Sequence, residues 1–387
     1  MNNKVRLGII GIGKMGSRHT QNIMDGKCPE IEITAISDDS PAHIEAYRER
    51  FGDFVKDVPA FTDSTALMDS GTVDAVLIAT PHYFHPTLAI EAMQRGLHVM
   101  CEKPAGVYTK QVKAMNEVAE KCDVVFGLMF NQRTNCVYRK MRELVRSGDY
   151  GQIRRTNWII TDWYRPQAYY DSGAWRATWS GEGGGVLLNQ CPHNLDLWQW
   201  ICGMPSKVYT KMHFGKWHNI EVEDDVTTYV EYPNGATGTF VTSTADAPGT
   251  NRFEITMDRA KLVVENDKLC MWELDVSEPE FSATNKEAFA QPEHTFREVE
   301  TDGLNIQHSA VLNAFAGAVL RGEPLVASGE EGIDSLTLSN AMHLSAWTGK
   351  EVELPFDDEE FYRLLKQRVE ASSRKEYNAF ARTDVND

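Results

Sequence analysis

Two basic side chains in this sequence lie where they could take part in proton transfer, for example at an alcohol. His193 follows a proline in the stretch GVLLNQCPHNLDLW, and Lys103 follows a short apolar run in HVMCEKPAG. The usual pKa of histidine, about 6.5, suits a base that takes an alcohol proton. A lysine ammonium can hold the oxygen and stabilise its developing negative charge. The other interpretations are a packed core histidine and a solvated loop lysine.

A glycine-rich loop lies near the N-terminus, in GIIGIGKMG. Gly11 allows a tight turn, Gly13 allows the backbone to approach a pyrophosphate, and Gly16 allows a helix to pack closely on a strand. The following helix then begins with unpaired N–H groups and a positive dipole end. Because this loop lies between an apolar strand and a helix, it predicts a dinucleotide site and not merely a glycine-rich turn.

The second apolar run ends in SDDS, which bears on the choice of dinucleotide. A carboxylate here, at Asp38, would bind the ribose hydroxyls and repel a 2′-phosphate. No arginine follows within a few residues, so the sequence favours NAD over NADP. Asp39 and Ser40 can alternatively cap a helix that begins at Pro41.

The elements that must position these residues change character along the chain. Up to residue 127, apolar strand-like runs alternate with helical patterns, which predicts a doubly wound parallel sheet. After about residue 150, strand-like runs follow one another, which predicts a large, mostly antiparallel sheet with helices near 306–320 and 333–347 and a charged final helix. We therefore expect an α/β domain at 1–127 and an α+β domain at 128–387. The predicted strands are 5–10, 31–36, 73–79, 97–101, 124–127, 152–163, 206–214, 226–232, 236–244, 252–257, 260–265 and 268–273.

Composition excludes several classes of protein. The 387 residues carry a formal net charge of −17, which disfavours nucleic acid and anionic lipid as partners. No apolar run reaches the roughly 18 residues of a membrane span, and no secretory pattern opens the chain, so we expect a cytoplasmic protein. The seven cysteines are scattered, without a C-x-x-C, which indicates reduced thiols and no metal site.

Nearly the whole chain resembles the Gfo/Idh/MocA family, named for glucose–fructose oxidoreductase and inositol dehydrogenase. The resemblance rests on GIGKMGSRH, TPHYFHPTLAIEAMQRGLHVMCEKPAG, FNQR, AWRATWSGEGGG, LLNQCPHNLDL and SLTLSNAMHLSAWTG. It implies a Rossmann domain followed by a domain with a large open sheet. One face of that sheet would cover the nicotinamide, and the other would form a homo-oligomer, a dimer or tetramer.

The resemblance also implies roles for individual residues. Lys103 and His193 match the catalytic lysine and histidine, and Asn189 stands where the family usually has aspartate. The predicted catalytic residues are therefore Lys103, His193 and Asn189. The predicted cofactor-binding residues are Gly11, Gly13, Lys14, Met15, Gly16, Asp38, Thr80, Pro81, His82, His85, Glu102, Lys103 and Asn131.

Asn189 raises a question of charge. An aspartate would stabilise a histidine cation, whereas an asparagine only orients it by hydrogen bonds. We expect the site to depend more on His193 and Lys103, or to recruit a carboxylate elsewhere. Asp196 is one candidate, three residues after His193, and its alternative role is an ordinary acid on a helix surface.

Aromatic and arginine side chains precede the GGG segment. Aromatic faces bind the C–H faces of sugar rings, and arginines and amides bind hydroxyls, although the same residues can simply pack. We predict a pocket for a neutral pyranose or cyclitol. The predicted substrate-binding residues are Arg133, Trp163, Tyr164, Arg165, Trp175, Arg176, Asn189 and His193.

The function expected from the sequence is NAD-dependent oxidation of a secondary hydroxyl on a sugar, sugar derivative or cyclitol. The resemblance leaves two alternatives open. One is an NAD-dependent glycosidase that oxidises its substrate transiently and releases no net NADH. The other is a non-catalytic sugar or dinucleotide sensor, which retention of both Lys103 and His193 disfavours.

Overall fold

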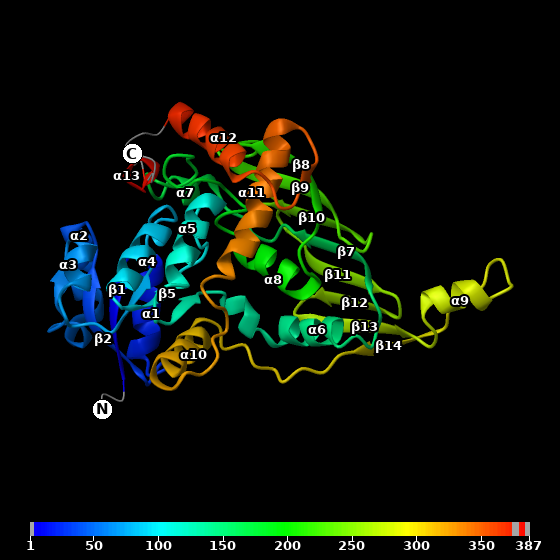
Figure 1. Ribbon diagram of the computed structural model, residues 1–387, viewed down its shortest axis with the longest axis horizontal. Coiled ribbons are helices and arrows are strands. Elements are labelled where there is room, and N and C mark those ends of the chain that lie inside the picture. Colours follow the sequence, from blue (N-terminus) through cyan, green and yellow to red (C-terminus); the bar gives the residue numbers. More distant parts are fainter. Residues whose placement is uncertain (1–3, 374–378, 384–387) are drawn as a thin grey trace.

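A computed structural model describes residues 4–373 and 379–383, which build two sheets with helices between and around them (Figure 1). The first sheet is made by the N-terminal part of the chain and the second by the C-terminal part. Within the described residues, no helix combines the length and the apolar character needed to cross a membrane.

The first sheet has six parallel strands in the order β3-β2-β1-β4-β5-β6. Its inner strands are apolar and almost fully buried because helices cover both faces. The strand order reverses between β1 and β4, and the carboxyl ends of strands at such a point form a ligand-binding crevice. The strands are β1 (Val5–Ile10), β2 (Ile31–Ser37), β3 (Ala60–Phe61), β4 (Ala75–Ile78), β5 (His98–Cys101) and β6 (Phe126–Leu128). The intervening helices are α1 (Lys14–Met24), α2 (Pro41–Phe51), η1 (Gly52–Phe54), α3 (Ser64–Met68), α4 (Phe84–Gln94) and α5 (Thr109–Ala119).

The second sheet has nine strands in the order β14-β13-β12-β11-β7-β10-β9-β8-β15. Every neighbouring pair is antiparallel except β7 and β10, so the predicted fold class is confirmed. The strands are β7 (Ile153–Ile160), β8 (Lys207–Phe214), β9 (Glu223–Glu231), β10 (Thr237–Ser243), β11 (Asn251–Met257), β12 (Ala260–Glu265), β13 (Lys268–Leu274), β14 (His294–Glu298) and β15 (Val352–Glu353).

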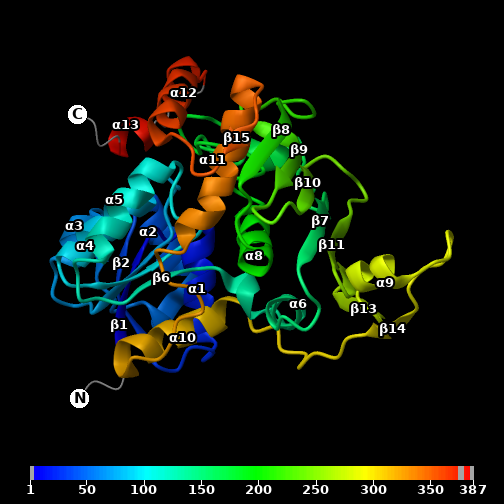
Figure 2. The ribbon, with the colours of Figure 1, turned by 45° about the vertical axis from the view of Figure 1, so that its right-hand side comes forward.

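Helices cover one face of this sheet and leave the other open (Figure 2). Alternate strand residues are buried beneath α8 and α11, while Ile159 and Tyr229 are exposed on the other face. The C-terminal helices and short helical turns are η2 (Asn131–Thr134), α6 (Cys136–Arg146), α7 (Gln167–Tyr170), α8 (Pro192–Cys202), α9 (Glu278–Thr284), α10 (His308–Arg321), α11 (Gly332–Thr348), α12 (Asp358–Ala371) and α13 (Ala379–Thr383).

Packing crosses the predicted domain boundary at residue 127. Helix α10 lies against the first sheet, where Val311, Leu312 and Phe315 share a buried core with Val5 and Leu7 (Figure 1). The C-terminal segment therefore returns to the N-terminal sheet, and the division into 1–127 and 128–387 stays a prediction. This return packs α10 against α1 and β1, and α11 against α5.

Candidate active site

The glycine loop between β1 and α1 has the geometry of an anion cradle. Gly11 has a φ of +86°, and a Cβ added there would lie 2.6 Å from the Ala79 carbonyl oxygen. A Cβ on Gly16 would lie 2.1 Å from the Gly11 carbonyl oxygen, whereas a Cβ on Gly13 would meet nothing within 4 Å. Gly13 is the N-cap of α1, and no side chain caps that helix. The first backbone N–H groups of α1, which include those of Lys14 and Met15, therefore suit a pyrophosphate.

Asp38 lies at the end of β2, where a dinucleotide ribose would be expected. Its carboxylate accepts hydrogen bonds from the backbone N–H of Ile12 at 3.3 Å and of Ser40 at 3.1 Å. His43 Nδ1 lies 2.9 Å from the same carboxylate, a neighbour that the sequence did not predict. Ser40 caps α2 as predicted. These contacts tie Asp38 to the glycine loop.

Buried polar atoms without partners mark the ends of β4 and β6. Thr80 Oγ1 and Asn131 Oδ1 make no hydrogen bond with any described residue, although both are buried. Because a buried polar atom normally has a partner, these atoms indicate a place for a bound group. Pro81 follows Thr80 and is half-buried, and the ring of His82 lies 5.8 Å from the Trp175 ring. The residues present thus fit a dinucleotide.

His85 and Glu102 have structural partners instead. His85 Nδ1 lies 2.7 Å from the Pro104 carbonyl oxygen and Nε2 lies 2.8 Å from the Thr80 carbonyl oxygen. Both ring nitrogens of His85 are thus directed at backbone carbonyls of two different loops, and its contact with the cofactor stays a prediction. Glu102 Oε1 lies 2.7 Å from Nε2 of buried His19. Burial raises the pKa of Glu102, but the His19 hydrogen bond and nearby positive charge prevail and lower it to about 2.

Lys103, at the end of β5, and His193, in helix α8, lie close enough for their charges to interact. Lys103 follows β5, its peptide bond to Pro104 is cis, and its Nζ donates a 2.8 Å hydrogen bond to the Asn189 backbone carbonyl. His193 is in the first turn of α8, after Pro192, and its buried Nδ1 has no hydrogen-bond partner among the described residues. Burial, and next the Lys103 charge, lower the pKa of His193 to about 3. The imidazole is therefore neutral near pH 7, and its buried Nδ1 is left without a partner.

The turn that presents Asn189 is held by a buried glutamate. Glu223, at the start of β9, accepts hydrogen bonds from the backbone N–H of Gly185 at 2.8 Å and of Leu187 at 3.0 Å. A Cβ on Gly185 would lie 2.1 Å from the Glu223 carbonyl oxygen, so this approach requires glycine. The GGG segment is thus the place where the turn passes directly over the sheet.

The sequence did not predict the carboxylate that lies beside Asn189. It is Glu182, a buried residue of the GEGGG segment, which accepts a hydrogen bond from Asn189 Nδ2. Both predicted roles of Asp196 are wrong, because Asp196 is buried and paired with Arg133 at 2.7 Å. Arg133 also pairs with Glu331 and is 1% exposed. Its charge is directed at these acids, and substrate binding by Arg133 stays a prediction.

The aromatic segment before GGG forms a cluster around Tyr169. The guanidinium carbons of Arg165 and Arg176 lie 5.1 and 4.7 Å from the Tyr169 ring centroid, and Arg176 lies 4.4 Å from the Trp175 ring centroid. The Tyr169 hydroxyl donates to Asn189 Oδ1 at 3.4 Å, which places this cluster beside the catalytic candidates. Tyr169 was not among the predicted site residues.

Trp163 and Tyr164 lie at the edge of this cluster. Trp163 is half-buried, and its Nε1 donates to Asn194 Oδ1 at 3.2 Å. Tyr164 is 49% exposed. Trp163 is therefore fixed next to the α8 turn that carries His193, whereas Tyr164 faces solvent.

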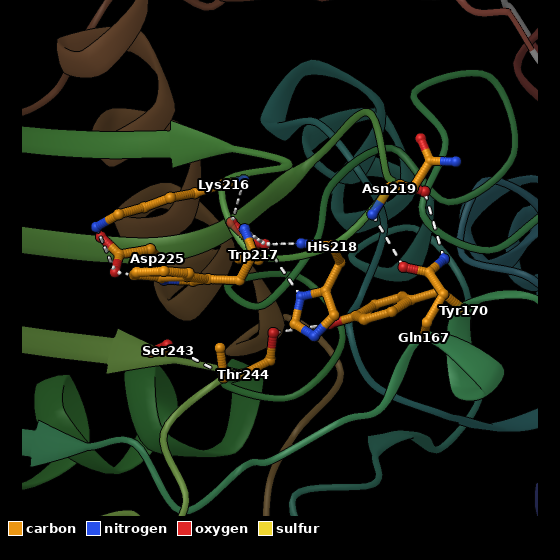
Figure 3. Close-up of polar contacts among 11 residues, drawn as sticks. Gln167, Tyr170, Lys216, Trp217, His218, Asn219, Asp225, Ser243 and Thr244 are labelled. Atoms are coloured by element: carbon orange, nitrogen blue, oxygen red, sulfur yellow. Dashed lines mark hydrogen bonds and ion pairs between the residues drawn. The ribbon is translucent and has the colours of Figure 1, made fainter.

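A second loop holds the aromatic segment from outside (Figure 3). The backbone N–H of Asn219 donates to Gln167 Oε1 at 2.9 Å, and the rings of His218 and Tyr170 lie 4.9 Å apart. Asp224, fully buried, accepts hydrogen bonds from the backbone N–H of residues 216–218, which fixes this loop between β8 and β9. The wall of the candidate site is therefore anchored to the sheet.

Comparisons with known proteins match both halves of the chain. Residues 5–130 match the NAD-binding Rossmann fold of the GFO/IDH/MocA oxidoreductase family, and residues 138–263 match the GFO/IDH/MocA C-terminal domain. Myo-inositol 2-dehydrogenase of Thermotoga maritima is 25% identical over 358 residues, covering 90% of this chain and 98% of that protein. D-glucoside 3-dehydrogenase of Escherichia coli is 25% identical over 369 residues, covering 90% and 97%.

A solved structure shows the same architecture over nearly the same length. The WlbA dehydrogenase of Chromobacterium violaceum, in complex with NADH and UDP-GlcNAcA, superposes with a TM-score of 0.79. It is 26% identical to this chain, and the match covers 92% of this chain and 98% of that one.

Proposed function

Because this chain belongs to the GFO/IDH/MocA family of NAD-binding oxidoreductases, we propose that it oxidises a secondary hydroxyl of a sugar, sugar derivative or cyclitol. The observation that carries this proposal is that Lys103 Nζ reaches the turn that leads into the His193 helix. Lys103 Nζ is bonded to the Asn189 carbonyl, and its charge is close enough to lower the pKa of His193, whose Nδ1 has no partner in the described part of the chain.

The cofactor in this proposal is NAD. The glycine loop and the N-terminus of α1 would hold its pyrophosphate, Asp38 its adenosine ribose, and Thr80 and Asn131 would supply polar contacts nearby. When bound, NAD⁺ accepts the hydride that leaves the carbinol carbon. The Asp38 carboxylate disfavours a 2′-phosphate, so NADP is the poorer cofactor.

Lys103 and His193 divide the chemistry at the substrate oxygen. The Lys103 ammonium binds the hydroxyl oxygen and stabilises negative charge as the O–H bond breaks. The imidazole of His193, neutral near pH 7, takes the hydroxyl proton. The alcohol thus loses one hydride and one proton and becomes a ketone.

The wall formed by Trp163, Arg165, Trp175 and Arg176 would contact a neutral pyranose or cyclitol. Indole faces suit sugar C–H groups, and guanidinium N–H groups suit hydroxyls. The inositol and glucoside dehydrogenases among the relatives support this substrate class.

A substrate panel tests the proposal. Pyranoses, inositols and glycosides are each supplied with NAD⁺ or NADP⁺, and the absorbance of the reduced cofactor is followed. We expect at least one cyclic polyol to yield stoichiometric NADH, with a slower reaction in NADP⁺. Product without net NADH would identify a glycosidase that oxidises transiently. Activity only with small aliphatic alcohols or amino acids would contradict the substrate class.

We also propose that the open face of the nine-stranded sheet forms a homo-oligomer, a dimer or tetramer. Ile159 and Tyr229 are exposed apolar residues of this face, at 41% and 39%. Light scattering should give a mass of two or four chains, and a monomer would contradict the proposal.

A further inference from the structure

Glu182 is a buried carboxylate that directly adjoins the candidate catalytic residues. It is 2% exposed, and one of its oxygens accepts a 2.5 Å hydrogen bond from the backbone N–H of Ala177. The other oxygen accepts from the side-chain amide of Asn189. Its own carbonyl oxygen lies 3.3 Å from Nδ1 of His82. Burying such a carboxylate costs free energy unless its charge is paired and its oxygens accept hydrogen bonds.

Asn189 connects this carboxylate to Lys103. Its Nδ2 donates to Glu182, its Oδ1 accepts from the Tyr169 hydroxyl at 3.4 Å, and its backbone carbonyl accepts from Lys103 Nζ at 2.8 Å. Both the nitrogen and the oxygen of the Asn189 side-chain amide are held by hydrogen bonds. These bonds restrain the residue, and with it the backbone carbonyl that accepts from the Lys103 ammonium. Glu182 therefore acts on Lys103 both through Asn189 and through its own negative charge, which raises the pKa of Lys103 against the effect of burial.

The charged groups around Glu182 determine when it carries that charge. Burial raises its pKa to about 7, and this exceeds the opposing effects of the Ala177 N–H, the Arg176 charge and the Asn189 amide. Arg176 Nη1 lies 3.9 Å from the carboxylate, and the negative charge of Glu223 raises the Glu182 pKa further. The carboxylate faces Arg176, Asn189, Lys103, Tyr169 and Glu223.

We propose that Glu182 is a positioning residue for the reaction, whose buried carboxylate supplies the negative charge that Asn189 lacks and orients the carbonyl that holds the Lys103 ammonium. This inference rests on the proposed function. Activity should fall as the pH drops and Glu182 takes up a proton, because Lys103 then loses its anionic support. His193 does not produce this fall, since its pKa lies near 3.

The test compares Glu182→Gln and Glu182→Asp with wild type, measuring kcat and KM from about pH 5 to about pH 9. We expect Glu182→Gln to lower kcat at least about tenfold above pH 7, with KM and NADH affinity within about twofold. The acid limb of the profile should vanish in Glu182→Gln and reappear, displaced, in Glu182→Asp. A Glu182→Gln profile that keeps the wild-type acid limb would overturn the inference.

Glu223→Gln is the matched control, because Glu223 is also a buried carboxylate that holds the same turn. It contacts backbone N–H groups there, so its loss should lower stability and leave the acid limb in place. If Glu182→Gln behaves in the same way as Glu223→Gln, Glu182 is only structural and the inference fails.

A readout without turnover separates this inference from the proposed function. An acylating reagent that reacts with unprotonated amines modifies Lys103. The rate of this modification, followed by mass spectrometry as a function of pH, reports the pKa of that lysine. We expect a lower Lys103 pKa in Glu182→Gln than in wild type. An unchanged value overturns the role of Glu182, whereas inactivity of wild type on every polyol refutes only the proposed function.

Discussion

At the scale of single residues, the surroundings of His193 keep it neutral but also make it a weaker base than a free histidine. Burial and the Lys103 ammonium both disfavour the imidazolium, which lowers the pKa of His193 to about 3. A neutral imidazole can accept a proton near pH 7, and the positive charge then formed must be relieved quickly.

Removing either catalytic candidate should impair chemistry and spare cofactor binding. We expect His193→Ala and Lys103→Ala each to reduce turnover at least about a hundredfold, because the base or the oxygen-binding ammonium is lost. NADH affinity, measured by fluorescence titration, should stay nearly unchanged. Near-normal turnover in His193→Ala would assign the base to another group, such as Tyr169.

The electrostatic coupling of Lys103 and His193 can be measured directly. The Lys103→Met substitution removes the positive charge and should raise the pKa of His193, which would then titrate at higher pH than in wild type. The pKa is followed by NMR of the imidazole, with His193→Gln identifying its signal. An unchanged His193 pKa would show that the two side chains do not share one site.

The sequence pointed to Lys103, His193 and Asn189 because each lies in a motif, but it did not point to Glu182, which lies beside Asn189. Glu182 could have been noticed as the one acid within a run of glycines. Asp196 could not have been placed, because its partner Arg133 is 63 residues away and only the folded chain brings them together. Local spacing predicts which residues share an element and not which elements meet.

At the scale of elements, a buried ion pair joins η2 to α8. Arg133 lies between Asp196 and Glu331, with its guanidinium 5.3 Å from the Trp200 ring centroid. This contact fixes α8, and hence its N-terminal turn with His193, relative to the end of β6. Arg133 therefore contributes to the site through the position of a helix.

Breaking this pair should destabilise the protein. We expect Arg133→Met to lower the free energy of unfolding by about 3–5 kcal/mol, because Asp196 is left as a buried, unpaired charge. Arg142→Met is the control, since Arg142 also contacts Trp200 but forms no ion pair among the described residues. Urea unfolding measures both. A raised sugar KM with unchanged stability in Arg133→Met would return Arg133 to the substrate pocket.

Most strands and long helices could be predicted because their apolar patterns reflect burial. The sequence did not predict β3, β14 and β15. These strands are short and lie at the edges of the two sheets, where few residues are buried. Helix α8 shows a different limit. It is buried on nearly all sides, so the helical period does not show which side faces solvent, and Asp196 was assigned to a surface that α8 does not have.

At the scale of the whole molecule, the site makes stability depend on pH. The folded-state pKa of Glu182, about 7, lies above its usual value, so its stabilising contribution is full below about pH 4.5 and is lost as the pH rises through 7. Glu102, with a pKa of about 2, acts in the opposite sense, because its contribution is lost as the pH falls from about 4.5 towards 2.

We therefore expect the free energy of unfolding of wild type to fall between about pH 5 and pH 8 as Glu182 ionises. In Glu182→Gln this fall should be smaller, by up to about 3 kcal/mol. Urea unfolding across this range measures the difference. Glu102→Gln is the control, and it should alter the acid range only. Parallel pH dependences for wild type and Glu182→Gln would show that Glu182 is ionised throughout.

The most direct measurement is a crystal structure with NADH and a cyclic polyol bound. We predict one hydroxyl oxygen within hydrogen-bond distance of both Lys103 Nζ and the His193 imidazole, with its carbon facing the nicotinamide. A structure in which these two side chains contact different groups, or are directed away from the nicotinamide, would contradict the account.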